Sequence, residues 1–396
     1  MLKIKFFLNF VKYFFGFFLN FLFLISFLIP KNKNIWIFSA WNGKKYSDNP
    51  KAIFSKILNG NRNIKAVWIS KNKDLYLELK SAKLPSVYAY SIRGFYYHLI
   101  AGAAIFTHSV DWDFLSFLIG PKTKKIQTWH GIPIKKIGLD DKRFPNQFLR
   151  KKIIEFLLPY KKDFKYDLVL AASEYDQLIY ESAFAVNKKK IVITGYPRND
   201  QLFNVLKVRN SEVNKVIYMP TFRGDIGSEF SLLESSNFDF DKANKFMKSI
   251  NAVLFIKLHP VQIYSKRDLL ASKDKSNVIL LNPSEDIYKN LASFNVLITD
   301  FSGTFFDFLI TGKPVIMAPF DFANYLSFDR DIYVKYNEIC PNRPCLNWNQ
   351  VFSMLKEISI NKKIDRRRYN FLQKKFHKYI DANSSKRAFT EIYKLV

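Results

Sequence analysis

The chain has 396 residues, enough for two domains of ordinary size. It carries 62 Lys and Arg against 34 Asp and Glu, a formal net charge of +28. With 48% apolar residues it can bury a sizeable core, which excludes a wholly disordered protein. Two Cys in this length exclude a disulfide-built secreted scaffold. The positive charge calls for an anionic partner, which is nucleic acid, anionic lipid or an anionic substrate.

The first 30 residues form a stretch rich in Phe and Leu that ends at Pro30. From Tyr13 to Ile29 there are 17 residues without a charge, the lower limit for a helix that spans a bilayer. Polar residues recur at Lys5, Asn9, Lys12, Gly16 and Asn20. On a helix these positions fall within an arc of about 80°. The pattern favours a helix lying in the membrane interface, and the alternatives are a spanning helix and a helix packed on its own domain.

After Pro30, short β-branched and aromatic runs alternate with stretches of helix length, which is typical of a parallel α/β sheet. The first series of predicted strands is 35–39, 66–70, 87–90, 103–108, 125–129, 168–172 and 191–195. The second series is 216–219, 253–258, 278–281, 296–299 and 314–318. The polar stretch 204–215 separates them. We therefore expect a membrane-associating helix (1–30), two α/β domains (31–205 and 206–364) and a helical tail (365–396).

Unusual polar residues follow five of these strands, at the edge where doubly wound sheets bind ligands. In chain order they are His130, Arg198, the run Pro220, Thr221 and Arg223, then Lys257 with His259, and finally Asp300, Ser302, Gly303, Thr304 and Asp307. One such ending is ordinary, whereas five indicate a site. We expect these side chains to face one cleft between the two domains.

Three of these groups suit an anionic, hydroxylated ligand. The run 302–304 opens a predicted helix, where it either binds a phosphate through backbone N–H groups or only caps the helix. Asp307, one helical turn further on, can accept hydrogen bonds from sugar hydroxyls. Arg198 and Lys257 can neutralise a diphosphate, unless they are ordinary surface charges.

Two histidines suit proton transfer, because imidazole titrates near neutral pH. His259 can donate to a phosphate oxygen or protonate a leaving group, and His130 can act as a general base. The remaining histidines, His98, His108 and His377, are interpreted as structural or surface residues. No carboxylate cluster is built to hold a metal ion, and Cys340 and Cys345 are interpreted as reduced thiols, so we expect no metal and no cofactor.

Five motifs in order, TWHGIPIKKIGLD, GYPRNDQL, MPTFR, KLHP and LITDFSGTFFDFLITGKPVIMAPFD, resemble the CDP-glycerol glycerophosphotransferase family of teichoic-acid synthesis. The resemblance covers roughly residues 30–330. It implies a GT-B-like fold, in which two Rossmann-type domains surround a cleft. It also implies that an acceptor hydroxyl attacks the β-phosphate of a CDP-alditol and releases CMP. Family members attach peripherally to the cytoplasmic face of the cell membrane, which agrees with the basic, Phe-rich start.

The same resemblance implies site residues. His130 matches the essential histidine of the WHG motif, and Arg198 matches the arginine of GYPRND. The remaining matches are Gly131, Ile132, Pro133 and Ile134 in the loop after His130, Pro220 and Thr221 of PTFR, Lys257, Leu258 and His259 of KLHP, and Ser302, Gly303 and Asp307. Gly303 stands where the family usually has Ser, which implies one lost hydroxyl contact to phosphate.

The expected partners are therefore CDP-glycerol or a related CDP-alditol, a lipid-linked glycan acceptor and an anionic membrane surface, with no nucleic acid. The alternative reading is a nucleotide-sugar glycosyltransferase of the same architecture, since fold alone does not fix the reaction. A nucleic-acid-binding protein and a non-catalytic membrane scaffold are further alternatives. The basic, apolar stretch 142–165 suggests either a second membrane-facing surface or an amphipathic helix packed on the domain. Wall teichoic acid, capsule and lipopolysaccharide are all open as products.

Overall fold

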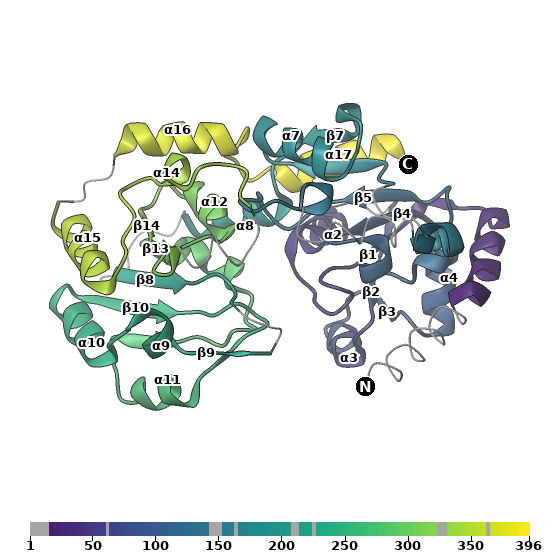
Figure 1. Ribbon diagram of the computed structural model, residues 1–396. Coiled ribbons are helices and arrows are strands. Elements are labelled where there is room, and N and C mark those ends of the chain that lie inside the picture. Colours follow the sequence, from purple (N-terminus) through teal and green to yellow (C-terminus); the bar gives the residue numbers. More distant parts are fainter. Residues whose placement is uncertain are drawn as a thin grey trace. The chain divides into compact units, whose positions relative to one another are not determined.

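The structure is a computed structural model (Figure 1). It describes residues 16–60, 63–141, 153–161, 165–206, 214–223, 227–322, 331–361 and 365–396. The chain forms two compact units. The first comprises residues 1–130, 138–200 and 383–396, and the second comprises 131–137 and 201–382.

The first unit is built on a seven-stranded parallel sheet in the order β3-β2-β1-β4-β5-β6-β7. Its strands are β1 (Asn32–Phe38), β2 (Lys65–Ser70), β3 (Ser86–Tyr88), β4 (Ala101–Phe106), β5 (Lys124–Gln127), β6 (Leu168–Ala171) and β7 (Ile191–Ile193). β4 is buried at all six positions, as expected for a strand covered on both faces. The strand order reverses between β1 and β4.

Helices cover both faces of the first sheet. They are α2 (Asp48–Gly60), α3 (Lys73–Ser81), α4 (Ile92–Ile100), α5 (Val110–Asp113), α7 (Glu174–Ala183) and α17 (Ser384–Leu395). On one face α2 and α17 pack on large apolar side chains of β1 and β2, including Trp36 and Trp68. α7 packs against β6 and β7, and the ring of Phe184, just after α7, contacts Tyr166. This is the doubly wound arrangement.

The second unit has a five-stranded parallel sheet in the order β12-β10-β8-β13-β14. Its strands are β8 (Asn214–Met219), β10 (Ala252–Ile256), β12 (Val278–Leu280), β13 (Val296–Thr299) and β14 (Val315–Met317). Two short strands, β9 (Glu229–Phe230) and β11 (Ile263–Tyr264), pair separately. In chain order the main sheet reads 3-2-1-4-5, so its order reverses between β8 and β13.

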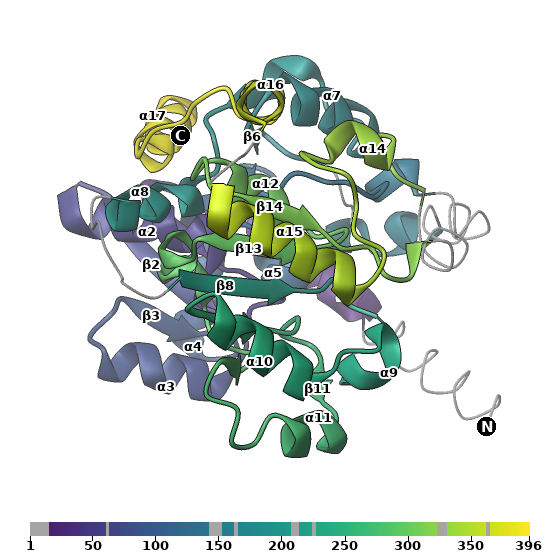
Figure 2. The ribbon, with the colours of Figure 1, turned by 90° about the vertical axis from the view of Figure 1, so that its left-hand side faces the viewer.

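The second unit also contains several helices, the first of which, α8, begins at the last residue of the first unit's segment 138–200. They are α8 (Asp200–Leu206), α9 (Leu232–Ser236), α10 (Phe240–Ser249), α11 (Lys266–Ala271), α12 (Thr304–Leu309), α14 (Tyr336–Ile339), α15 (Trp348–Asn361) and α16 (Arg366–Phe376). α10 and α15 share one core cluster with β8, and Figure 2 shows both beside that strand. α12 and α16 lie side by side, where the rings of Phe306 and Phe376 are 4.5 Å apart (Figure 1).

All twelve predicted strands are present, and both sheets are parallel, so the predicted α/β fold is confirmed. The chain divides differently from the expected domains in two places. The stretch 131–137 belongs to the second unit, and the predicted tail 365–396 is split. Its first helix, α16, packs on α12 of the second unit, whereas α17 packs on α2 of the first unit. Contacts distant in sequence decide both assignments.

Residues 16–28 form a helix that precedes β1. The polar positions Lys5, Asn9 and Lys12 lie outside the described residues. The two that are described pack on the first unit: Tyr160 donates to the Gly16 carbonyl and Asn20 Nδ2 donates to the Leu157 carbonyl. No helix among the described segments is both long and apolar enough to cross a membrane.

Candidate active site

Each sheet reverses its strand order at one point. The predicted residues His130 and Arg198 follow β5 and β7 of the first sheet, whereas Thr221 and Asp300 follow the two strands at the reversal of the second sheet. In the first unit β1 ends just before Trp41, and β4 ends just before Thr107 and His108. In the second unit β8 leads into Pro220 and Thr221, and β13 leads into Asp300. Open α/β sheets bind ligands outside the strand ends at such reversals.

His130 stands on a strained turn after β5. Its neighbours Trp129 and Gly131 have φ angles of 51° and 129°. A left-handed conformation is costly for a bulky residue such as Trp, and the angle of Gly131 is accessible mainly to glycine. Trp41 and Asp48, from the first unit's other loops, are also left-handed. Strain of this kind persists only where surrounding contacts hold it, and it concentrates at functional sites.

Aromatic rings surround the His130 imidazole. The ring centroids of Trp129 and His130 are 4.2 Å apart, and the Trp41 ring lies 5.6 Å from His130. The His108 ring stacks almost parallel to His130, with centroids 4.6 Å apart and planes 12° apart. His130 Nδ1 also lies 3.4 Å from the carbonyl oxygen of Thr107.

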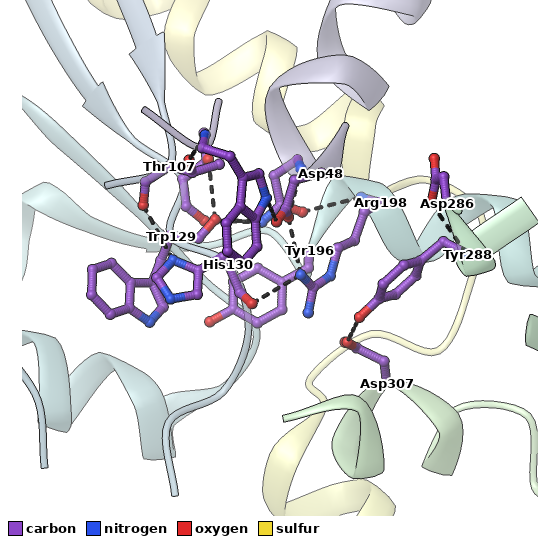
Figure 3. Close-up of polar contacts among 12 residues, drawn as sticks. Asp48, Thr107, Trp129, His130, Tyr196, Arg198, Asp286, Tyr288 and Asp307 are labelled. Carbon is purple, nitrogen blue, oxygen red and sulfur yellow. Dashed lines mark hydrogen bonds and ion pairs between the residues drawn. The ribbon is translucent and has the colours of Figure 1, made fainter. Parts of the chain in front are cut away.

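A buried ion pair holds the backbone of the His130 turn. Arg198 Nη1 donates to Asp48 Oδ1 at 3.0 Å and to the His130 carbonyl at 2.9 Å, as Figure 3 shows. Both charged side chains are only 4% exposed. Asn49, which is fully buried, donates to the carbonyls of Thr128 and Trp129 and accepts from the Arg198 N–H. The first turn of α2 therefore fixes the loop that carries His130.

In the second unit Asp300 joins the loops after β8 and β13. Its Oδ1 accepts from the Thr221 N–H at 2.8 Å and from the Thr221 hydroxyl. Its Oδ2 accepts from Arg223 Nη2 at 2.7 Å, and Arg223 also forms an ion pair with Asp321. These contacts give the PTFR segment one defined conformation at the strand-order reversal.

The KLHP segment places two predicted site residues differently. Lys257 is 3% exposed and its Nζ donates to the Pro283 carbonyl at 2.9 Å, so it is tied to the loop after β12. His259 is half-buried, and its Nδ1 accepts from the Val261 N–H at 3.4 Å. A histidine that accepts through Nδ1 carries its proton on Nε2, which makes Nε2 a donor. Leu258, between them, is fully buried in the core.

The segment after β13 forms the start of α12. Gly303 is the N-cap residue with a φ of −59°, and the Ser302 hydroxyl accepts from the Thr304 N–H at 3.3 Å. Asp307 is fully buried and accepts from the Tyr288 hydroxyl at 2.6 Å (Figure 3). The sequence suggested that Asp307 accepts a hydrogen bond from a sugar hydroxyl. In this structure it accepts one from the tyrosine hydroxyl instead.

The loop after His130 is a strap of the second unit. The Tyr333 N–H donates to the Ile134 carbonyl at 2.9 Å, and Lys135 bridges Ile332. Gly131, Ile132, Pro133 and Ile134 are all buried. The predicted substrate contacts of these four residues would thus come through the backbone of a strap that is packed in place.

Several residues that shape the first unit's site were not predicted as site residues from the sequence. These are Trp41, Asp48, Asn49, Thr107, Asp113 and His108, which was interpreted as a structural or surface residue. Among the described residues, no group of three or more His, Cys, Asp or Glu is placed to hold a metal ion.

Comparison with known proteins identifies the class of protein. Residues 21–394 match the model of the family "CDP-Glycerol:Poly(glycerophosphate) glycerophosphotransferase", so the chain belongs to this family. It is 30% identical over 383 residues to the teichoic acid glycerol-phosphate transferase of Staphylococcus aureus, covering 92% of this chain and 94% of the relative.

Solved structures support the fold. The wall teichoic acid polymerase TagF superposes with a TM-score of 0.72 at 22% identity, covering 92% of this chain and 89% of the TagF chain. A UDP-N-acetylglucosamine 2-epimerase superposes with a TM-score of 0.53 at 13% identity, covering 92% and 96%. The GT-B-like fold that the motifs implied is confirmed.

The family also confirms the predicted reaction class. The chain is a glycerophosphotransferase that takes glycerol phosphate from CDP-glycerol.

Proposed function

We propose that this enzyme transfers glycerol phosphate to a hydroxyl of a membrane-linked glycan or teichoic-acid-like acceptor and releases CMP. The observation that carries the proposal is the placement of His130 on a strained turn. Hydrogen bonds from Asn49 and from the Asp48–Arg198 ion pair to backbone carbonyls fix this turn. Side chains are fixed in this way where a reacting group must be pre-positioned.

In the proposed reaction His130 takes the proton of the acceptor hydroxyl as general base. The acceptor oxygen forms a bond to the β-phosphorus of CDP-glycerol, and the bond from that phosphorus to the CMP oxygen breaks. His259, as an Nε2–H donor, stabilises a phosphate oxygen or protonates the leaving group. The donor binds at the strand-order reversal of the second unit, near Thr221 and Ser302.

Product analysis tests the reaction. Purified protein is given CDP-glycerol, CDP-ribitol or UDP-sugars together with a synthetic lipid-linked disaccharide, and products are identified by mass spectrometry. We expect CMP and an acceptor that has gained glycerol phosphate. Transfer of a sugar from UDP instead would establish the glycosyltransferase alternative.

Substitution of His130 tests the base. His130→Ala is expected to lower kcat by at least ~100-fold while donor binding persists, because a positioned base contributes on this scale. Added imidazole is expected to restore part of the activity. Full activity of His130→Ala would refute the role of His130.

Arg198 and Lys257 were predicted to neutralise the diphosphate. Both are buried against protein partners, so their substitution can also act by moving His130 or the loop after β12. Titration with CDP-glycerol separates the two effects. If Lys257 contacts the diphosphate, Lys257→Met weakens donor binding. If Lys257 only positions the loop, Lys257→Met lowers kcat and leaves donor binding unchanged. Arg267→Ala, at an exposed ion pair with Glu234, is the control for removal of a positive charge.

We also propose peripheral attachment to the cytoplasmic face of the cell membrane. One side of the helix 16–28 contacts Leu157 and Tyr160, while its other side exposes a group of apolar side chains. These are Phe17, Phe18, Phe21, Leu24 and Leu28, between 60% and 82% exposed. Phe156, which precedes the Leu157 that contacts this helix, is also 85% exposed. Such a face, on a protein of charge +28, suits an anionic membrane interface. The described part of the stretch 142–165 is limited to 153–161 and 165.

Vesicle binding tests the attachment. The wild-type protein is expected to co-sediment with phosphatidylglycerol vesicles, and the triple variant Phe17→Ser, Phe21→Ser, Leu24→Ser is expected to stay in solution. Ile92→Ser is the matched control, because Ile92 is 90% exposed on α4 and not part of this face. Equal sedimentation of the triple variant and the wild type would contradict the proposal.

A further inference from the structure

His108 lies where the strand order of the first sheet reverses, next to the proposed base. One residue, Thr107, separates it from the end of β4, and the neighbouring strand β1 leads into the loop that carries Trp41. The rings of His108 and Trp41 meet edge to face at 5.0 Å, and the Trp112 ring also stacks on His108 at 6.0 Å. His108 is thus enclosed by aromatic rings on the loops that surround the site.

A chain of hydrogen bonds fixes the His108 ring. Asp113 is fully buried, and its Oδ2 accepts from the N–H groups of Thr107 and His108, both at 2.9 Å, and from the Thr107 hydroxyl at 3.3 Å. The Thr107 Oγ1 lies 2.8 Å from His108 Nδ1. A carboxylate only accepts, so the Thr107 hydroxyl donates to Asp113 and His108 Nδ1–H donates to Thr107. The tautomer of His108 is thereby set, with its lone pair on Nε2.

Thr107 anchors both imidazoles. Its hydroxyl holds Nδ1 of His108, and its carbonyl oxygen faces Nδ1 of His130. The two rings are therefore attached to one residue through the same ring nitrogen, which accounts for their parallel stacking at 4.6 Å. The backbone of His130 is fixed separately, because Arg198 donates a hydrogen bond to its carbonyl oxygen.

We propose that His108 is a positioning residue for His130, and that its ring, fixed by Thr107 and Asp113, is the surface against which the His130 imidazole is held for reaction. The proposal rests on the proposed role of His130 as the base. Burial lowers the pKa of His108, against the opposing effects of Asp113 and Asp48, so its ring is mainly uncharged at neutral pH. An uncharged ring stabilises the positive charge that His130 gains, because the cation faces a π system.

Three variants separate the ring from its hydrogen bond. His108→Phe keeps a stacking ring and loses the bond to Thr107; His108→Asn keeps a polar atom at the position of Nδ1 and loses the ring; His108→Ala loses both. We expect kcat to fall roughly 10- to 100-fold in the Ala and Asn variants, the scale of a small misplacement of a reacting group. We expect a clearly smaller loss in the Phe variant and an unchanged KM for CDP-glycerol in all three.

The control is Tyr90→Ala, which removes an exposed ring that meets Tyr88 edge to face elsewhere in the same unit and is expected to leave kcat unchanged. Thermal unfolding of each variant checks its folding. If the Ala variant does not fold, the comparison of Phe with Asn still decides. A Phe variant as impaired as the Asn variant, or an Ala variant with wild-type kcat, overturns the proposal.

A second readout does not depend on activity. The protein has five histidines, and nitrogen NMR of ¹⁵N-histidine-labelled protein reports the tautomer of each ring. We expect His130 to hold one tautomer in the wild type and in His108→Phe, and to populate both in His108→Ala. An unchanged His130 signal in His108→Ala contradicts the positioning role. Full activity of His130→Ala would refute the base but leave this signal to decide whether His108 holds the ring.

Discussion

His98 illustrates how the fold commits a single side chain to one protonation state. The ring is fully buried; its Nδ1 lies 2.7 Å from the Gly94 carbonyl, and its Nε2 accepts from the Leu115 N–H at 3.2 Å. A second proton on the ring would have to sit on Nε2, where it would point at the Leu115 N–H, and Nε2 could no longer accept from that group. Burial, together with the smaller effect of Lys71, lowers the pKa of His98 to about 4 despite the bond to Gly94.

This histidine makes stability depend on pH. The unfolded chain binds the His98 proton near pH 6.5 and the folded chain only near pH 4, so stability is full above 6.5 and falls as the pH drops through this window. The loss reaches about 3 kcal/mol. Urea unfolding at pH 7 and pH 5 is expected to show a smaller difference in His98→Gln than in the wild type. Equal differences would contradict the assignment.

Gly303 is the position at which the motif resemblance implies a Ser in the family. Its φ of −59° is ordinary for any residue, and an added Cβ would meet only the Ile132 carbonyl oxygen, at 3.5 Å. We therefore expect Gly303→Ser to fold with unchanged stability. If the donor phosphate binds here, the new hydroxyl is expected to lower KM for CDP-glycerol by roughly 10-fold or more, the effect of one hydrogen bond to a charged group. An unchanged KM would place the phosphate elsewhere.

At the scale of elements, the first turn of α2 joins three loops of the first unit through Asp48 and Asn49. Arg198→Met leaves the buried Asp48 charge without its ion-pair partner and is expected to cost about 3–5 kcal/mol of unfolding free energy. The double variant Asp48→Leu, Arg198→Met is expected to lose clearly less than the sum of the single losses.

The exposed pair Arg267–Glu234, 75% and 66% exposed, is the matched control. The coupling energy between Arg267 and Glu234, measured in the same way from two single variants and the double variant, is expected to stay below about 1 kcal/mol. Additive losses at Asp48 and Arg198 would show that the buried pair is not coupled.

Strands were predictable because each is a compact apolar run between polar segments. The two strands that were missed, β9 and β11, have two residues each, too few to show a pattern. The start of α2 was not recognised as part of the site, because its importance lies in contacts with residues about 80 to 150 positions away. His108 is different: it ended a predicted strand, and the rule that selected His130 and His259 would have selected it too.

For the whole molecule, the last helix is a core element of the first unit. Ala388 and Ile392 of α17 are fully buried, the Phe389 ring lies 5.6 Å from Trp36, and Arg387 donates to the Thr194 carbonyl. Removal of residues 383–396 is expected to expose the cluster around Trp36 and lower the unfolding midpoint by well over 5 °C, as a loss of several kcal/mol would do.

The matched control is Lys394→Ala, which removes an exposed side chain and its ion pair with Glu391 near the end of α17 but no core residue. Differential scanning calorimetry measures both variants. A truncated chain with the midpoint of the control would show that α17 adds nothing to the core.

The backbone passes from one unit to the other after His130, Ile137, Asp200 and Ala382. A chimera that borrows the second unit of a relative therefore cannot be joined at a single splice point near residue 200. Such a chimera would combine a foreign sheet with the native strap 131–137. The Ile134 carbonyl of this strap accepts a hydrogen bond from the Tyr333 N–H of the second unit. Exchange of the second unit between relatives by recombination thus requires the strap 131–137 and the second sheet to be transferred together, while the terminal helix α17 remains with the first unit.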